Sequence, residues 1–191
     1  MHQQEPDFDI ATDWRLETTP EELTAIVLDP QLIHLWCPSV FMEAELLERG
    51  RPDGLGMSIR LYTKGLLPHS FVFTAEIVDL VPHRSMTIAV RGDFEGAGFL
   101  KVEPAESGFC VAGLHWRTDI RHPYIKYVKR ILRPVFKWNH KWAMRRARSL
   151  MQEEIFRRRR ASNQFTRAQA TFPHNIKSLR TLLRRDFPAN R

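Results

Sequence analysis

Hydrophobic and polar residues alternate along much of the chain, as they do on strands that are buried on one face. Phe8, Ile10, Trp14 and Leu16 occupy even positions near the start, and this spacing predicts a half-buried strand. Similar short runs predict further strands over about 40–48, 57–64, 70–80, 85–91, 94–103 and 109–120. The breaks between these runs are short and contain turn residues such as Gly and Pro, which favours an antiparallel meander.

Two short helices are expected between the first two strands. A helix start is predicted at Thr19, which can cap the helix, while Pro20 suits the first helical position and Glu22 completes a capping box. A second short helix is expected over about 32–36, and Pro38 should end it.

A helical period replaces the alternation from Tyr124 to Phe156. At about 100° per residue, apolar side chains fall on one side of this helix and Lys and Arg on the other. The apolar stripe contains Tyr124, Val128, Ile131, Val135, Trp138 and Trp142. We expect this stripe to face the sheet, with Asn139 close to its centre. Pro134 lies inside the pattern and predicts a kink or a new helix start.

The order of these elements is a strand, two short helices, a run of strands and a long helix. It predicts an α+β fold, in which a curved antiparallel sheet grips the long C-terminal helix and two short helices follow the first strand. The space between sheet and helix is either packed solid or left as a pocket.

This order, together with four motifs, resembles the START-like (SRPBCC) superfamily, the polyketide cyclase/dehydrase and lipid-transport group, over about Phe8 to Phe156. The motifs are Asp29-Pro30…His34-Leu35-Trp36, Lys64-Gly65-Leu66-Leu67-Pro68, Gly92-Asp93-Phe94-Glu95-Gly96-Ala97-Gly98 and Trp138-Asn139-His140-Lys141-Trp142. The resemblance implies a helix-grip fold and a lipid, polyketide or similar aromatic ligand. It does not choose among carriers, receptors and cyclases.

Positive charge is concentrated at the C-terminal end of the chain. The formal net charge is +7, yet ten Lys or Arg and a single acid, Asp186, lie from Arg157 onwards. We therefore expect a START-like domain over 1–160 and a basic tail over 161–191. The tail carries a possible amphipathic helix with Ile176, Leu179, Leu182, Leu183 and Phe187 on one side. Such a helix can lie on anionic lipid, dock on its own domain or stay disordered.

Several classes of function find no support in the sequence. There is no phosphate loop, nucleophile elbow, paired-cysteine motif or metal-ligand spacing, so no cofactor and no metal are expected. The pI near 9.8 describes the tail more than the fold, so no nucleic-acid partner is expected. The chain shows no membrane-spanning run or secretion signal, and its two cysteines, Cys37 and Cys110, favour a reducing cytoplasm.

The candidate binding site is the space between sheet and long helix. Its expected ligand-binding residues are Trp36, Phe71, Phe73, Met86, Trp116, Val135, Asn139, Trp142 and Arg146. Asn139 is the expected polar anchor, because ligand pockets fix orientation with few polar groups. In the alternative reading Asn139 bonds to sheet backbone, and Arg146 extends to solvent or pairs with an acid.

Other polar residues have weaker functional readings. His140 lies at the margin of the apolar stripe and is expected either on the helix surface or behind the residues that contact a ligand, although a histidine there could act as a base. Asp93 and Glu95 could act together, but a solvated turn is the favoured interpretation. Lys64 could meet an anionic head group, and an exposed lysine at a strand end is the default.

These observations favour binding of a hydrophobic or amphipathic small molecule, lipid or polyketide-like. A polyketide cyclase/dehydrase-type enzyme is one alternative, and no catalytic residue can be named for it. A membrane-peripheral or regulatory module acting through the basic tail is another, with contact to anionic membrane. The oligomeric state is left open.

Overall fold

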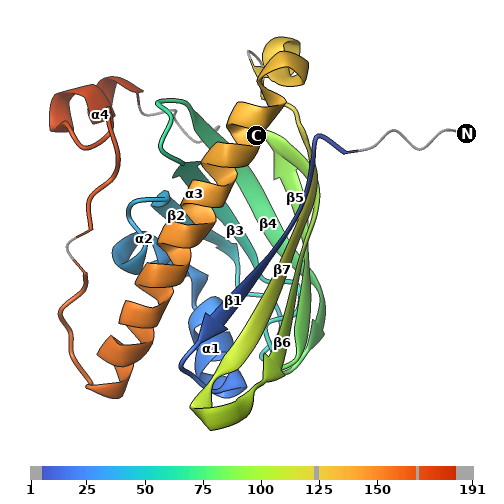
Figure 1. Cartoon of the computed structure of the whole chain (residues 1–191), viewed down its shortest axis with the longest axis vertical. Helices are drawn as coiled ribbons and strands as arrows, with labels where there is room; N and C mark the ends of the chain where they lie inside the picture. The colour runs from blue at the N-terminus through green and yellow to red at the C-terminus, as the bar shows by residue number, and fades with distance from the viewer. Residues whose placement is uncertain (1–5, 123–124, 167, 184–191) are drawn as a thin grey trace, which may run out of the picture.

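The computed structural model describes residues 6–122, 125–166 and 168–183. Its strands form one seven-stranded antiparallel sheet in the order β1-β7-β6-β5-β4-β3-β2. The strands are β1 (Phe8–Leu16), β2 (Phe41–Glu48), β3 (Ser58–Lys64), β4 (Ser70–Val81), β5 (Ser85–Gly92), β6 (Phe94–Pro104) and β7 (Cys110–Ile120). The sheet curves around one long helix (Figure 1). The predicted α+β fold and strand positions are therefore confirmed.

The helices follow the expected order. They are α1 (Pro20–Val27), the 3-10 turn η1 (Pro30–Leu32), α2 (Ile33–Trp36), the 3-10 turn η2 (Glu106–Gly108), α3 (Ile125–Arg159) and α4 (Lys177–Leu183). The predicted capping box is present, since the Thr19 side chain accepts from Glu22 N and the Glu22 carboxylate accepts from Thr19 N. α3 continues through Pro134, and Figure 1 shows its first turns set at an angle to the rest. Within the described residues, no helix is both long and apolar enough to cross a membrane.

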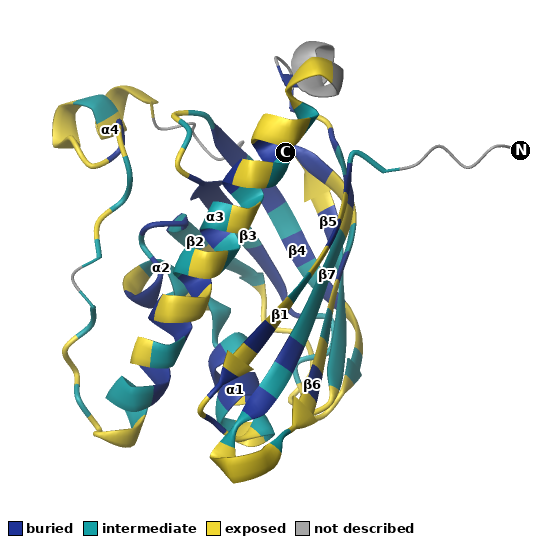
Figure 2. Ribbon diagram, viewed as in Figure 1, coloured by how far each residue is buried: buried dark blue, intermediate teal, exposed yellow. Residues whose placement is uncertain are grey.

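The buried face of α3 is not the one predicted. Ile131 is 81% exposed, Trp138 is 51% exposed and Val135 is 40% exposed, so this stripe faces outward. Tyr124 and the Val128 side chain lie outside the described residues. The side chains that turn inward are Phe136, Asn139, Ala143, Ala147, Leu150, Met151, Glu154 and Ile155. Figure 2 shows this buried band along the helix.

The phase of the helix is set by its C-terminal half. Ala147 and Leu150 are almost completely buried in a core cluster shared with α1 and α2, and a helix has one rotational phase along its length. Continued toward the C-terminus, the predicted stripe reaches Arg145 and Ser149, which are exposed. The stripe is therefore turned away from the sheet by about 100°, the rotation of one residue.

After α3 the chain turns back, and we call its described residues 162–166 and 168–176 the strap (Figure 1). Ser39 Oγ donates to the Gln169 carbonyl at 3.1 Å, and Phe165 packs against the core cluster. The Tyr62 hydroxyl lies 2.8 Å from Nε2 of His174, which is itself buried. These contacts favour docking on the domain among the three alternatives for the tail.

The helix that follows the strap contacts strands β2 and β3 through Arg180 and Leu183. Arg180 donates to the Met42 carbonyl of the edge strand β2 at 3.2 Å, and Tyr62 donates to the Leu183 carbonyl at 3.1 Å. α4 buries none of its residues. Of the expected apolar stripe, Ile176, Leu182 and Leu183 are exposed and Leu179 is partly exposed, while Phe187 lies outside the described residues.

Candidate functional site

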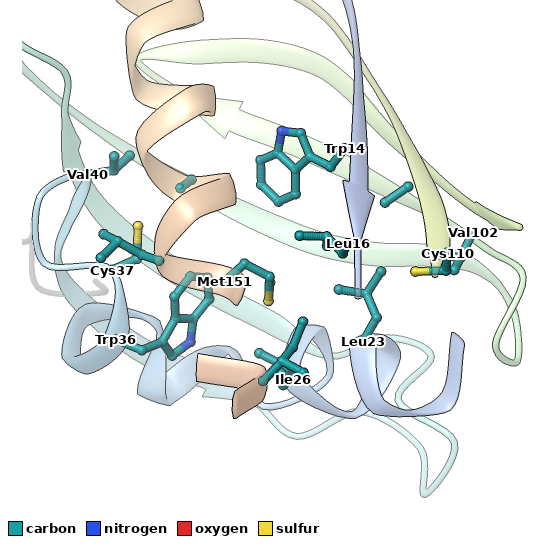
Figure 3. Close-up of a cluster of buried hydrophobic side chains, with 14 of the residues drawn as sticks. Trp14, Leu16, Leu23, Ile26, Trp36, Cys37, Val40, Val102, Cys110 and Met151 are labelled. Atoms are coloured by element: carbon teal, nitrogen blue, oxygen red, sulfur yellow. The ribbon is translucent and has the colours of Figure 1, made fainter. Parts of the chain in front are cut away.

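A cavity of about 320 Å³ lies between the inner face of the sheet and α3. Both core clusters contribute to its lining. One cluster is aromatic and includes Phe8, Phe71, Phe73, Phe94 and Phe136; the other includes Trp14, Leu23, Trp36 and Met151. Figure 3 shows the second cluster, in which Met151 of α3 lies near Trp36 of α2 and Ile26 of α1. The wall of this cavity is thus mostly aromatic and aliphatic.

Strand alternation decides which side chains enter the cavity. On β3, Ile59, Leu61 and Thr63 belong to its lining. Tyr62, at the alternate position, lies outside the lining and bonds to His174 of the strap. Successive strand residues point to opposite faces, so one strand serves both the cavity and the docking of the strap.

The cavity brings together most of the residues expected at the site. Trp36, Phe71, Phe73, Met86, Trp116 and Asn139 line it, and whether they bind a ligand stays a prediction. Val135, Trp142 and Arg146 lie outside the lining. The rotation of α3 explains this correction, because it replaces these large side chains with Ala143 and Ala147, which leave space.

The three displaced residues have other surroundings. Val135 is at the surface, and Trp142 packs, partly buried, against the core cluster that includes Trp36. Nε of Arg146 lies 3.5 Å from Oγ of Ser39, the serine that holds the strap. Arg146 therefore stands on the strap side of α3.

Asn139 is bonded within the protein. Its Oδ1 accepts from Leu66 N at 2.7 Å and from Leu67 N at 3.1 Å, so the buried amide joins α3 to the β3–β4 loop. This arrangement matches the alternative reading, in which Asn139 bonds to backbone, although the backbone belongs to the loop next to the sheet and not to a strand. Two orphan backbone donors are satisfied by one side chain.

Two histidines at the cavity carry no charge at neutral pH. Burial lowers the pKa of His140 to about 4. Burial, with the nearby His122 and Lys64, lowers the pKa of His69 to about 4. Both line the cavity, so the partly buried His140 lies at the cavity wall and not on the outer surface of the helix. The ring of His69 makes edge contacts with Phe71 and Phe136 at 4.9 and 5.3 Å.

His69 was missed by sequence reasoning, although a signal existed. It precedes β4 and shares odd numbering with Phe71 and Phe73, which face inward. Because residues two apart on a strand share a face, parity alone points His69 toward the cavity.

Lys64 is buried, not exposed as the default reading expected. Burial lowers its pKa to about 8. Its ammonium donates to the Gly65 carbonyl at 2.8 Å, to the Phe172 carbonyl at 3.1 Å and to the Thr171 hydroxyl. Its charge is therefore held at the strap, even though Lys64 contributes to the cavity wall.

The carboxylates of the glycine-rich segment have structural partners. The buried Asp93 accepts from Val72 N at 2.7 Å, and the exposed Glu95 pairs with Arg121 at 2.8 Å. They do not line the cavity. In the part of the chain that the structure describes, no group of His, Cys, Asp or Glu is placed to hold a metal ion.

Comparisons with known proteins agree with this architecture. Similar solved structures include a START superfamily protein from Mycobacterium smegmatis, 15% identical with a TM-score of 0.62, covering 78% of this chain and 97% of that one. The Zhui aromatase/cyclase from Streptomyces sp. R1128 is 14% identical with a TM-score of 0.62, covering 81% and 96%. A conserved protein from Geobacillus kaustophilus is 14% identical with a TM-score of 0.57, covering 78% and 96%. At these identities the likeness shows the fold.

No curated protein matches the chain. A family model described as polyketide cyclase/dehydrase and lipid transport matches residues 8–157. That span contains the whole sheet and nearly all of α3, and with it every residue that lines the cavity. The chain therefore belongs to the polyketide cyclase/dehydrase and lipid transport family.

Proposed function

We propose that this protein binds an uncharged, mostly apolar small molecule between the sheet and α3. The observation that carries the proposal is the cavity of about 320 Å³ with an aromatic and aliphatic wall. Sites for small molecules are typically mostly apolar, with a few polar groups and volumes of about 300–1,000 Å³. A volume at the lower end of that range favours one ring system or one chain over a lipid with two acyl chains.

The polar groups of the wall favour a neutral ligand. His69 and His140 are uncharged at neutral pH because their pKa values lie near 4. The ammonium of Lys64 donates to the Gly65 carbonyl and, on the strap, to the Thr171 hydroxyl and the Phe172 carbonyl. A carboxylate or phosphate inside the cavity would gain an ionic partner only by drawing Lys64 away from these bonds, and burying an unpaired charge is costly. Ligand hydroxyl or carbonyl oxygens, by contrast, can bond to an imidazole.

A matched pair of probes tests this proposal. 1-Pyrenemethanol and 1-pyrenecarboxylate have the same ring system and differ in charge, and pyrene fluorescence reports transfer into an apolar site. We expect the alcohol to bind at least about tenfold more tightly than the carboxylate, a difference of roughly 1.4 kcal/mol. Equal binding, or tighter binding of the carboxylate, would contradict a neutral ligand. Mass spectrometry of molecules that copurify with the protein would then identify the natural ligand.

A cyclase or dehydrase reaction on a polyketide-like molecule is the second candidate. It is favoured by one observation, an unprotonated His140 in the wall of an apolar cavity, since neutral imidazole can accept a proton from a bound substrate. A pKa near 4 makes it a weak base, so binding without turnover remains the first candidate. Incubation with a poly-β-ketone and mass spectrometry separates the two. Loss of water with wild type and not with His140→Phe would indicate catalysis.

A further inference from the structure

Exposed apolar side chains gather in three segments of the chain. Of the thirteen large hydrophobic residues that are exposed in the described residues, nine belong to these segments. They are Ile131, Leu132, Val135 and Trp138 on α3, Leu66 in the β3–β4 loop, and Phe172, Ile176, Leu182 and Leu183 on the strap and α4. Single exposed hydrophobics are ordinary, whereas a cluster points to an interaction site.

Hydrogen bonds tie these three segments together. Asn139, next to Trp138, accepts from the backbone of Leu66, which fixes the loop beside α3. The Thr171 hydroxyl donates to the Gly65 carbonyl at 2.7 Å, which fixes the strap beside the same loop. Figures 1 and 2 show that the N-terminal part of α3, the β3–β4 connection and α4 lie at one end of the molecule. We call this surface the apolar face.

Positive charge predominates around the apolar face, where Glu43 lies 4.0 Å from Arg180. No Asp or Glu occurs in residues 65–69, 122–152 or 155–185. Lys141 follows Trp138 by three residues and Arg145 follows it by seven, so both lie on the same side of α3. Lys177 and Arg180 are exposed on α4. The face thus combines exposed aliphatic and tryptophan side chains with Lys and Arg.

The arginine run at the end of α3 belongs to a different environment. Arg157 and Arg158 bond to the buried Glu154 at 2.5 and 2.7 Å. Arg159 bonds to Glu22 at 2.8 Å. These cations have close acidic partners within the fold, whereas Arg180 on the apolar face lies 4.0 Å from its acidic neighbour Glu43. The strongest run of positive charge in the sequence is therefore not the docking surface.

We propose that the apolar face docks on an anionic lipid bilayer. Tryptophan favours the boundary between head groups and acyl chains, aliphatic side chains gain by entering it, and Lys and Arg gain from anionic head groups. A second copy of the chain would bring like charges together, and nucleic acid would leave the aliphatic side chains without a partner. An anionic bilayer offers acyl chains to the apolar side chains and negative head groups to Lys and Arg.

Docking by this face would also place one end of the cavity at the membrane. Gly65, His69 and Asn139 line the cavity and lie at the junction that the face surrounds. An apolar ligand could then move between the bilayer and the cavity with little exposure to water. The docking proposal itself does not depend on the identity of the ligand or on its binding.

Vesicle flotation with the full chain tests the proposal. The probes are vesicles of phosphatidylcholine alone and of phosphatidylcholine mixed with phosphatidylglycerol. We expect wild type to float with the mixed vesicles and less with the neutral ones, and high salt should weaken this binding. The variant Val135→Ser/Trp138→Ser should reduce the partition coefficient roughly tenfold, because both side chains leave water only on docking.

A matched variant controls for lost hydrophobicity in general. Val78 and Val81 are exposed on β4, away from the apolar face, and Val78→Ser/Val81→Ser should float like wild type. Urea unfolding of both variants verifies that they fold. Absence of flotation by folded wild type overturns the proposal. Equal loss of flotation in Val135→Ser/Trp138→Ser and in Val78→Ser/Val81→Ser also overturns it. So does a wild-type protein that does not bind vesicles but forms a dimer, if Val135→Ser/Trp138→Ser dissociates that dimer. Because flotation requires no pyrene probe, its failure is distinguishable from failure of the ligand proposal.

Discussion

Asn139 on α3 lies so close to Gly65 that a methyl group on that glycine would stand 2.3 Å from its Oδ1. The same oxygen accepts from the backbone of Leu66 and Leu67. Glycine at position 65 thus allows the amide to reach the next two N–H groups of the loop. This contact closes the sheet over the helix at one end of the cavity.

The first prediction is that Gly65 and Asn139 are energetically coupled. Gly65→Ala should displace the amide and strand two backbone donors, which costs about 1–3 kcal/mol. Asn139→Ala strands the same donors and should cost a similar amount. In the double variant the second change should cost little, since the bonds are already lost. Urea unfolding of the four proteins gives the coupling, and fully additive losses would contradict the contact.

The second prediction concerns the volume of the cavity. Ala143 lines it and is buried, so Ala143→Leu should fill space that the ligand would occupy. We expect about tenfold weaker binding of 1-pyrenemethanol, with stability unchanged or increased, because the added side chain meets empty volume. Ser149→Leu adds similar bulk on the exposed side of α3 and serves as the control. Unaltered affinity in Ala143→Leu would locate the probe elsewhere.

The strands and their order could be predicted from the sequence, but the side of α3 that faces the sheet was predicted wrongly. Alternation of apolar residues is a direct consequence of strand geometry, and turn residues marked each reversal, so strands and order could be predicted. For α3 the largest apolar residues defined the stripe, which placed Trp138 and Val135 inward. In the structure Ala143 and Ala147 face inward instead, and their small side chains leave space for the cavity. The hydrophobicity of the residues alone does not show that alanines would occupy the inner face.

Residues of the site could be predicted where strand alternation alone sets their direction, and could not be predicted where contacts join segments far apart in the sequence. Phe71 and Phe73 follow from alternation, and His69 would have followed from the same parity. The environment of Lys64 depends on Thr171 and Phe172, more than a hundred residues away. No local sequence pattern predicts that contact. The sequence alone therefore leaves three alternatives for the tail: binding to lipid, docking on the domain and disorder.

The third prediction is that the strap stabilises the domain. Removing residues 161–191 would expose Tyr62 and leave the buried Lys64 without its Thr171 and Phe172 partners. For a protein of this size about 1 kcal/mol corresponds to roughly 2–4 °C, so we expect the melting temperature to fall by more than about 4 °C. An unchanged melting temperature would indicate that the strap is separable. His174→Ala, which removes only the buried imidazole, should give a smaller decrease.

The fourth prediction is a loss of stability in mild acid that His140 helps to cause. In the unfolded chain its pKa is near 6.5, and burial lowers it to about 4 in the folded protein. Above pH 6.5 both states are neutral and the contribution of His140 is complete. As the pH falls from 6.5 toward 4, the unfolded state takes up the proton first, so stability decreases. The slope from one such group approaches about 1.4 kcal/mol per pH unit.

His140→Phe isolates this contribution, because the ring is kept and the proton site is removed. Between pH 6.5 and 4 the unfolding free energy of the variant should depend on pH less steeply than that of wild type, and the difference in slope should correspond to nearly one proton. His69 and His174 keep part of the pH dependence, because burial also lowers their pKa values. The ion pair of Glu22 with Arg159 does not contribute to the slope above pH 4.5, because the Arg159 bond lowers the pKa of Glu22 from 4.5 to about 2. Its stabilisation is lost only as the pH falls below 4.5. Identical slopes above pH 4.5 in His140→Phe and wild type would mean that His140 is solvated, and the cavity would then have to be open to water at that end.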